Sequence, residues 1–312
     1  MIDLSHVTRR YGDFVAVDDV SFSITPGEVV GLLGHNGAGK TTLMKMLTGY
    51  LEPTAGTIRV DDLQIGRDTR RIQARIGYLP ENCPLWPEMT VAEFLLFQAA
   101  LHGVPPAQRA QAVARALRRT DLQDRATAPI YTLSRGYRQR VGVAQAILHR
   151  PDIVILDEPT NGLDPAQILQ MRELIRELAQ EATVIVSTHI LQEVQAVCQR
   201  VVILRAGRKV LDARMDELQR HARLLVTLDC EEAVARPVLQ QVPGVQAVQY
   251  EGAYGRHHRY ALEASPEAAP AVSRAVLQAG FGLHALHFER RDLETLFAQL
   301  DRVSSEEVRH VA

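Results

Sequence analysis

Residues 34–41 read Gly34-His35-Asn36-Gly37-Ala38-Gly39-Lys40-Thr41, which is a complete phosphate-binding loop of the form G-x-x-x-x-G-K-[ST]. The apolar run at 29–33 predicts a short buried strand before it, and Thr42 opens a helical pattern after it. Such a loop wraps a triphosphate in backbone N–H groups at a helix N-terminus. Lys40 is then expected to reach the β- and γ-phosphates, and Thr41 to bind Mg²⁺. This context disfavours a chance glycine-rich turn.

Composition indicates a globular chain of two domains. Its 312 residues suffice for one large domain and a smaller one, and 46% apolar residues can build cores. The net charge of −2 argues against nucleic-acid binding, which needs a strongly basic face. Three scattered cysteines favour reduced thiols over disulfides. No apolar run approaches the ~20 residues of a membrane span, and no secretory signal is visible, so any membrane part is expected from another chain.

The strand and helix patterns beyond the loop predict a parallel α/β core. Apolar runs of strand length lie at 153–156, 184–186 and 201–204. A helical pattern over 166–180 separates the first two runs. Buried strands that alternate with helices indicate a parallel sheet. Residues from about 84 to 149 look helical, which predicts a helical subdomain.

The pattern changes at about residue 220 and predicts a second domain. Its expected strands lie at 224–228, 245–250, 259–262 and 281–288, and its expected helices at 233–241 and 268–279. This βαββαβ order predicts a small α+β domain of ferredoxin-like type. Leu293, Leu296, Phe297 and Leu300 have the spacing of a last helix. The predicted domains are therefore 1–219 and 220–312.

Two acidic residues, Asp157 and Glu158, follow the apolar run 153–156. A carboxylate at the tip of a buried strand is the usual second half of a site that has a phosphate loop. Asp157 is expected to hold Mg²⁺ through its water shell. Glu158 is expected to orient the attacking water or take its proton. A solvated acidic turn before Pro159 is the alternative, which the phosphate loop upstream disfavours.

A third segment carries a family resemblance. It runs Leu133-Ser134-Arg135-Gly136-Tyr137-Arg138-Gln139-Arg140 and opens a helical pattern. Ser134 and Gly136 at a helix start can make an anion site from a hydroxyl, N–H groups and the helix dipole. The segment resembles the L-S-G-G-Q signature of the ATP-binding subunits of ABC (ATP-binding cassette) transporters. Arg135 replaces the first glycine and Tyr137 the glutamine, as in the branch that serves type-2 exporters.

The resemblance implies a P-loop ABC ATPase cassette, with a mixed sheet core and a helical subdomain, before the small C-terminal domain. Tyr11 resembles the aromatic that stacks on adenine, although a turn tyrosine is the plainer alternative. His189, after the run 184–186, resembles the switch histidine that contacts the γ-phosphate. Asp164 resembles part of the loop that crosses between two cassettes. The implied ATP-binding residues are Tyr11, Val17, Gly34, His35, Asn36, Gly37, Ala38, Gly39, Lys40, Thr41, Thr42, Glu81, Ser134, Arg135 and Gly136.

The segment 76–81 resembles the family's Q-loop, but Glu81 stands where a glutamine is expected. A glutamate is a better ligand for Mg²⁺ than a glutamine. It also brings negative charge close to the phosphates. Glu81 is therefore a third candidate metal ligand beside Thr41 and Asp157, and a simple turn glutamate is the alternative.

The implied function is ATP hydrolysis by Glu158 and His189 that drives export. Two copies would face head to tail as a homodimer, with ATP and Mg²⁺ between Lys40 of one copy and Ser134 of the other. A separate membrane-spanning permease would contact the helical region at about 83–98, with the chain cytoplasmic and peripheral at the inner face of the cell membrane. The apolar stretch 84–87 is a candidate docking patch, and a packed loop is the alternative. The sequences of segments 34–37, 77–82 and 134–140 resemble those of gliding-motility-associated exporter ATPases. They are also similar to the ATPase of the nitrous-oxide-reductase maturation exporter.

A soluble ABC-type nucleotide switch that acts on ribosomes or DNA is the competing hypothesis. Ribosome-acting relatives carry two cassettes, whereas one phosphate loop is present here. DNA-repair relatives carry a long coiled coil, and no heptads separate Lys40 from Asp157. A GTPase or small-molecule kinase lacks support, because the chain has no Asn-Lys-x-Asp motif and neither class explains the segment around Ser134.

Overall fold

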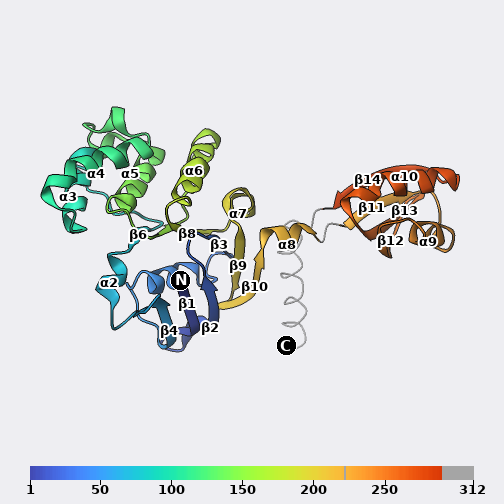
Figure 1. Cartoon of the computed structure of the whole chain (residues 1–312), viewed down its shortest axis with the longest axis horizontal. Coiled ribbons are helices and arrows are strands. Elements are labelled where there is room, and N and C mark those ends of the chain that lie inside the picture. The colour runs from blue at the N-terminus through green and yellow to red at the C-terminus, as the bar shows by residue number, and fades with distance from the viewer. Residues whose placement is uncertain (221–222, 290–312) are drawn as a thin grey trace. The chain divides into compact units, whose positions relative to one another are not determined.

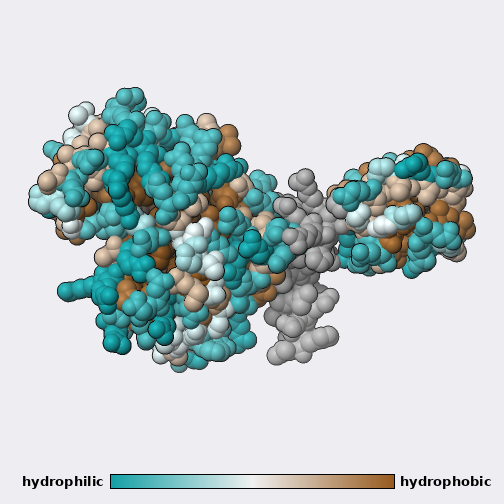
Figure 2. Space-filling model, in the orientation of Figure 1, coloured by the Kyte–Doolittle hydropathy of each residue, from teal (hydrophilic) through white to brown (hydrophobic). Residues whose placement is uncertain are grey.

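The computed structural model describes residues 1–220 and 223–289. The chain divides into two compact units, Met1–Arg214 and Met215–Ala312 (Figure 1). Space filling shows polar side chains over much of the visible surface of the first unit (Figure 2). Among the described residues, no helix has the length and apolar character needed to cross a membrane.

A six-stranded sheet forms the centre of the first unit, in the order β10-β9-β3-β8-β7-β6. The strands are β3 (Val29–Leu33), β6 (Ile76–Leu79), β7 (Ile153–Asp157), β8 (Thr183–Thr188), β9 (Arg200–Arg205) and β10 (Arg208–Arg214). Every pair is parallel except β10 with β9. All residues of β3, β7 and β8 are buried, as expected of central strands in a sheet covered on both faces. The predicted parallel α/β core is confirmed.

A second, antiparallel sheet has the order β2-β1-β4-β5. Its strands are β1 (Ile2–Tyr11), β2 (Phe14–Ile24), β4 (Ala55–Val60) and β5 (Leu63–Gln64). One apolar core joins side chains from this sheet, from the six-stranded sheet and from α1 (Lys40–Leu47). Because Leu43, Met44, Met46 and Leu47 are all buried in it, the helix that follows the phosphate loop is fixed on several sides.

The remaining helices of this unit follow the chain in order. They are α2 (Thr69–Gln73), α3 (Val91–Leu101), α4 (Pro106–Arg119), α5 (Arg135–Ile147), α6 (Pro165–Leu178) and α7 (Leu191–Val197), with 3₁₀ turns η1 (Gln123–Arg125) and η2 (Ile130–Thr132). Helices α3, α4 and α5 pack on one another, and α5 also packs on β6 and β7. The α3 helix begins with a capping box between Thr90 and Glu93.

The second unit has a four-stranded antiparallel sheet in the order β12-β13-β11-β14. Its elements are α8 (Met215–Arg220), β11 (Arg223–Leu228), α9 (Glu232–Gln240), β12 (Val245–Tyr254), β13 (His257–Ala264), η3 (Pro266–Ala268), α10 (Ala269–Gln278) and β14 (Leu283–Glu289). Leu239 of α9 and Val272 and Val276 of α10 pack with Tyr260 in one core. The helix predicted around Leu293–Leu300 lies outside the described residues.

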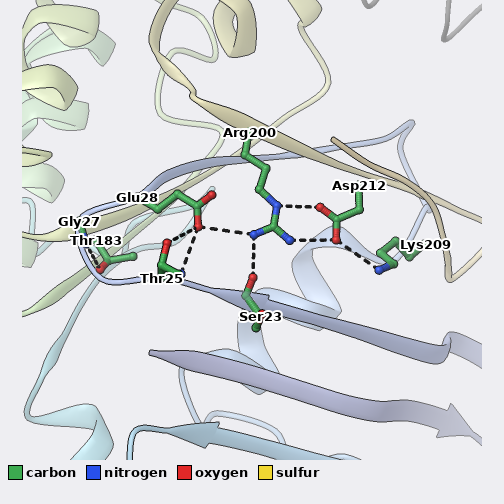
Figure 3. Close-up of polar contacts among 8 residues, drawn as sticks. All are labelled: Ser23, Thr25, Gly27, Glu28, Thr183, Arg200, Lys209 and Asp212. Atoms are coloured by element: carbon green, nitrogen blue, oxygen red, sulfur yellow. Dashed lines mark hydrogen bonds and ion pairs between the residues drawn. The ribbon is translucent and has the colours of Figure 1, made fainter. Parts of the chain in front are cut away.

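An ion-pair network around Arg200 ties β9 to its neighbours (Figure 3). The guanidinium donates from Nε and Nη2 to the two carboxylate oxygens of Asp212 at 2.7 and 2.9 Å, and from Nη1 to the Ser23 carbonyl at 2.8 Å. Glu28 lies 3.5 Å from the same Nη1. Burial alone would raise the pKa of Asp212, but the bonds from Arg200 and Lys209 hold it below its usual value.

Arg200→Gln is expected to lower the free energy of unfolding by about 2 kcal/mol, because Asp212 and Glu28 lose their shared cation in a largely buried place. Urea unfolding followed by circular dichroism measures this change. Since the pKa of Asp212 is depressed in the folded state, the stabilisation is present above about pH 4 and is lost as pH falls through the lower folded value. The difference between wild type and variant therefore shrinks in acid.

Arg208→Gln is the matched control, because Arg208 pairs with Asp18 while it stays exposed. An exposed pair contributes less than about 1 kcal/mol. If Arg200→Gln costs no more than this control at pH 7, the network does not hold β9 in place.

Candidate functional site

The phosphate loop lies between the end of β3 and the start of α1, where its backbone must turn sharply. Gly39 is the residue before α1 and has φ +103°, a conformation that glycine adopts freely. A Cβ atom there would lie 2.5 Å from the Ala16 carbonyl oxygen, so no other residue fits without movement. The loop therefore presents its N–H groups at the positive end of α1, where an anion is favoured.

The Lys40 side chain crosses this loop and is only 6% exposed. Its Nζ donates to the carbonyl oxygens of Gly34 at 2.7 Å and His35 at 3.2 Å. Glu158 Oε1 lies 3.9 Å from Nζ. Burial lowers the pKa of Lys40, and the charges of Glu158 and Asp157 act in the opposite direction. A buried ammonium group thus stands between the loop and two acidic residues.

Asp157 ends β7 and is fully buried. Among the described residues, neither of its carboxylate oxygens has a hydrogen-bond partner. Burial raises the pKa of Asp157, and the charge of Glu158 raises it further. The hydroxyls of Ser187 and Thr41 act in the opposite direction, although neither lies at hydrogen-bonding geometry to the carboxylate. Buried unpaired oxygens are rare, and a cation satisfies them. Asp157 and the Thr41 hydroxyl therefore fit a Mg²⁺ ion.

Glu158 occupies a strained backbone position with φ +50°. Such a conformation costs a non-glycine residue of the order of 1–3 kcal/mol and is frequent at functional sites. Its N–H donates to the Ser187 carbonyl at 2.8 Å, which helps to hold the turn. His189 Nδ1 lies 3.0 and 2.9 Å from the two Glu158 carboxylate oxygens. A carboxylate oriented by an imidazole can accept a proton from water.

One cavity of about 340 Å³ collects most of these groups. Its lining consists of Phe14, Ala16, Asn36, Gly37, Gly39, Lys40, Thr41, Thr42, Glu81, Glu158, Asn161 and His189. The loop, the Q-loop-like glutamate, the strand-tip glutamate and the histidine thus meet in one place, although they are far apart in the chain. Gly34, His35, Ala38 and Asp157 are not among the lining residues.

The segment around Ser134 is not part of that cavity. Ser134 is the N-cap of α5, and its Oγ accepts from the Tyr137 N–H at 3.4 Å. The Arg135 guanidinium packs on Gly162, where an added Cβ would come within 2.6 Å of it. Asp164 caps α6 nearby in sequence. The start of α5 and the loop 161–164 therefore pack together on one chain, and neither Ser134, Arg135, Gly136 nor Asp164 lines its cavity.

Comparison with known proteins places the chain in a family. A family model described as ABC transporter matches residues 17–161. The Nod factor export ATP-binding protein I of Paraburkholderia xenovorans is 40% identical, over 68% of this chain and 70% of the relative. Its counterpart in Ralstonia nicotianae is 33% identical, over 96% of this chain and 93% of the relative. The chain belongs to the ABC transporter family. It is an ATP-binding subunit, an ABC ATPase that binds ATP with Mg²⁺.

Solved structures agree with the cassette fold. A bacterial ABC transporter cassette solved as a dimer aligns with a TM-score of 0.64 at 25% identity, over 69% of this chain and 99% of its own. CbiO1 from Clostridium perfringens, part of the ABC transporter complex cbiONQ, aligns with a TM-score of 0.63 at 29% identity, over 78% and 95%. The predicted ABC cassette is confirmed.

Sequence reasoning missed an aromatic residue of the ABC ATPase cavity. Phe14 lines the cavity and is 64% exposed, whereas Tyr11 is not among the lining residues. The Tyr11 ring instead carries the Arg9 guanidinium 4.8 Å from its centre. Val17 of β2 is fully buried. The available signal was a second aromatic residue three positions after Tyr11, at the start of β2.

Glu81 of the ABC ATPase lines two cavities. Besides the phosphate cavity, it borders a groove of about 630 Å³ whose wall includes Leu85, Tyr131 and Arg138. Trp86 follows Leu85 in sequence and is 48% exposed, and its ring centre lies 4.7 Å from that of Phe97, with the two rings tilted by 33°. An exposed aromatic cluster beside a groove is typical of a protein-binding surface. One acidic residue therefore connects the nucleotide cavity to that groove.

Proposed function

We propose that this ABC ATPase powers export through a separate membrane-spanning permease, by ATP-driven closure of two copies of the chain. The proposal rests on the separation, within one chain, of the phosphate-binding and hydrolytic residues from the Ser134 segment. Lys40, Glu81, Glu158 and His189 share one cavity, whereas the Ser134 turn lies outside it. A second copy can supply that turn to the open side of the cavity.

The roles within one cavity follow from its contacts. The loop N–H groups and Lys40 bind the β- and γ-phosphates, and the hairpin aromatics Tyr11 and Phe14 stack on adenine. Asp157 and Thr41 would hold Mg²⁺, with Glu81 as a further oxygen ligand, and the ion would neutralise phosphate charge.

Hydrolysis depends on Glu158 and His189. Glu158 accepts a proton from water as the water oxygen bonds to the γ-phosphorus and the bond to the β–γ bridging oxygen breaks. His189 Nδ1, within 3.0 Å of that carboxylate, keeps it aimed into the cavity beside the γ-phosphate. The bridging oxygen stays on ADP with the electron pair of the broken bond, the water oxygen stays on the released phosphate, and Glu158 returns its proton to solvent.

The seam between two copies explains the Ser134 segment. The Ser134 hydroxyl and the N–H groups of Arg135 and Gly136 lie at the start of α5. In the closed pair they contact the γ-phosphate held by the other copy. The loop that ends at Asp164 crosses the same seam. ATP favours the closed pair because it gains contacts there that the open pair lacks, and hydrolysis removes them.

The groove beside Glu81 is the permease-docking surface, and the chain works as a peripheral subunit at the cytoplasmic face of the membrane. Tyr131 in the groove wall and Trp86 beside it are exposed aromatic residues, and Leu85 of the wall is half-buried. Because Glu81 borders both cavities, a change at the phosphates reaches the docked permease directly.

The names of the Paraburkholderia and Ralstonia relatives support the export direction and disfavour a ribosome or DNA switch.

Residues 220–312 form the ferredoxin-like accessory domain of this exporter ATPase, after a cassette at 1–219 that holds a helical subdomain at about 84–149. The antiparallel order β12-β13-β11-β14, with two helices packed against the sheet, supports that class. Within the exporter ATPases, the chain falls in the class of the gliding-motility and nitrous-oxide-reductase maturation exporters. The sequences of segments 34–37, 77–82 and 134–140 support this assignment.

Trp86→Glu is expected to release the permease, because a charge at an exposed aromatic anchor costs about 2 kcal/mol of binding, or about 30-fold in affinity. The measurement is recovery of a multi-span membrane protein with the tagged chain from detergent-solubilised membranes of its own cell. Val210→Glu, on the exposed edge strand β10, is the control. If both variants retain the membrane protein equally, the groove is not the docking surface.

A further inference from the structure

Glu193 is a buried acidic residue in α7 that takes no part in the nucleotide cavity. It is 3% exposed, and glutamate is almost never so buried without partners. Its Oε1 atom has no hydrogen-bond partner among the described residues. A carboxyl group kept in such a place, when an apolar residue would cost less desolvation, points to a specific task.

The partners of Glu193 are two hydroxyls from two functional segments. Its Oε2 atom accepts from the Thr160 hydroxyl and, at 3.2 Å, from the Thr188 hydroxyl. Both threonines are buried as well. Thr160 belongs to the turn after Glu158, and Thr188 is the last residue of β8, next to His189. A single oxygen atom of Glu193 therefore connects the turn that follows Glu158 to the strand end that precedes His189.

The Thr188 side chain also fixes the backbone around His189. Its Oγ accepts from the Ile190 N–H at 3.1 Å, so one hydroxyl bridges the residues on either side of the histidine. Because that hydroxyl donates to Glu193, the position of the His189 backbone depends on the carboxyl group.

The hydrogen bond from Thr160 connects Glu193 to the loop 160–164, which the proposed function places between two copies. The Asn161 N–H donates to the Glu158 carbonyl at 3.2 Å, and the Leu163 N–H donates to the Thr160 carbonyl at 3.1 Å. These bonds make a compact turn from Glu158 to the α6 cap at Asp164. A shift of Thr160 therefore moves the whole loop.

We infer that Glu193 is a positioning residue that couples His189 to the loop 160–164, so that the state of the γ-phosphate sensed by one is passed to the other at the seam. The inference rests on the proposed function, because it uses the roles of His189 and of that loop. Glu193 itself touches neither nucleotide nor water in the reaction. Its effect is on the alignment of the Glu158 carboxylate and of the Asp164 loop, and hence on kcat rather than on ATP affinity.

The test replaces the acceptor and keeps the shape. Glu193→Met has similar length without an acceptor, whereas the side-chain carbonyl of Glu193→Gln can accept from both threonines. Glu193→Met is expected to lower kcat of the purified full chain about 10- to 100-fold, as loss of a supporting contact does elsewhere. KM for ATP should stay within about twofold, and Glu193→Gln should restore most of kcat.

Thr160→Val supplies a second variant that leaves the Thr188 arm in place. As a single substitution it should lower kcat. In the Glu193→Met background it should lower kcat little further, because both substitutions break the same hydrogen bond between Thr160 and Glu193. Thermal melting and the stoichiometry of ATP binding report how much protein is folded. A kcat that falls only in proportion to folded protein, or Gln and Met variants that are equally impaired, would overturn the coupling role. Those results leave the proposed function intact, which fails instead if Glu158→Gln still hydrolyses ATP.

Discussion

Glu158→Gln is expected to abolish ATP turnover, by about 10²- to 10⁴-fold, while ATP still binds. The amide keeps the shape of the side chain at the strained turn but cannot take a proton from water. Lys40, the loop N–H groups and the Asp157 carboxylate are untouched, so the phosphates keep their contacts. Hydrolysis of ATP by the purified chain, measured as phosphate release, gives the first half of the result.

The second half is the state of association. Since ATP is no longer consumed, the closed pair should accumulate with ATP and Mg²⁺, and light scattering after size exclusion should show a dimer. ADP should leave the variant monomeric. Glu177→Gln, an exposed glutamate of α6, is the control and should behave like wild type. Wild-type turnover in the Glu158 variant would remove this residue from the mechanism.

Lys40→Ala is expected to weaken ATP binding about 10- to 100-fold, because a charged hydrogen bond to phosphate contributes about 1.5–3 kcal/mol. It should lower turnover further, since the ammonium group also stabilises charge that develops in the transition state. The position is specific: Nζ lies inside the loop, within hydrogen-bond distance of the Gly34 and His35 carbonyls. Titration of a fluorescent ATP analogue measures the binding step.

Lys45→Ala is the matched control, because Lys45 lies on the same helix α1 and faces solvent. The two variants lose the same charge, so a difference between them reports position and not net charge. ATP binding by Lys40→Ala within about twofold of the control would contradict the assignment of the loop.

The central strands and the phosphate loop could be predicted from the sequence. The strands β3, β7 and β8 are short apolar runs that end at recognisable motifs, and both faces are buried. The strand β6 was not predicted, because it has four residues and includes Gly77. That glycine lets α5 approach, since a Cβ there would lie 2.1 Å from the Ala146 carbonyl oxygen. Such a packing reason is invisible before the fold is known.

Two parts of the site also lay beyond sequence reasoning. Glu193 looks like any helical glutamate, because its partners Thr160 and Thr188 belong to other segments and meet it only in the fold. Phe14 was missed because the hairpin geometry that brings it to the cavity wall is not visible in the sequence. The antiparallel strand β10 was missed as well, since its polar residues lack the pattern of a buried strand.

The proposed mechanism requires an ATP site shared between two copies, which a structure of the Glu158→Gln variant with ATP and Mg²⁺ can show. We expect a γ-phosphate bound by Lys40 of one copy and by the Ser134 hydroxyl and Gly136 N–H of the other. A closed structure in which ATP fills the cavity of about 340 Å³ while both Ser134 turns stay remote from it would rule the shared site out.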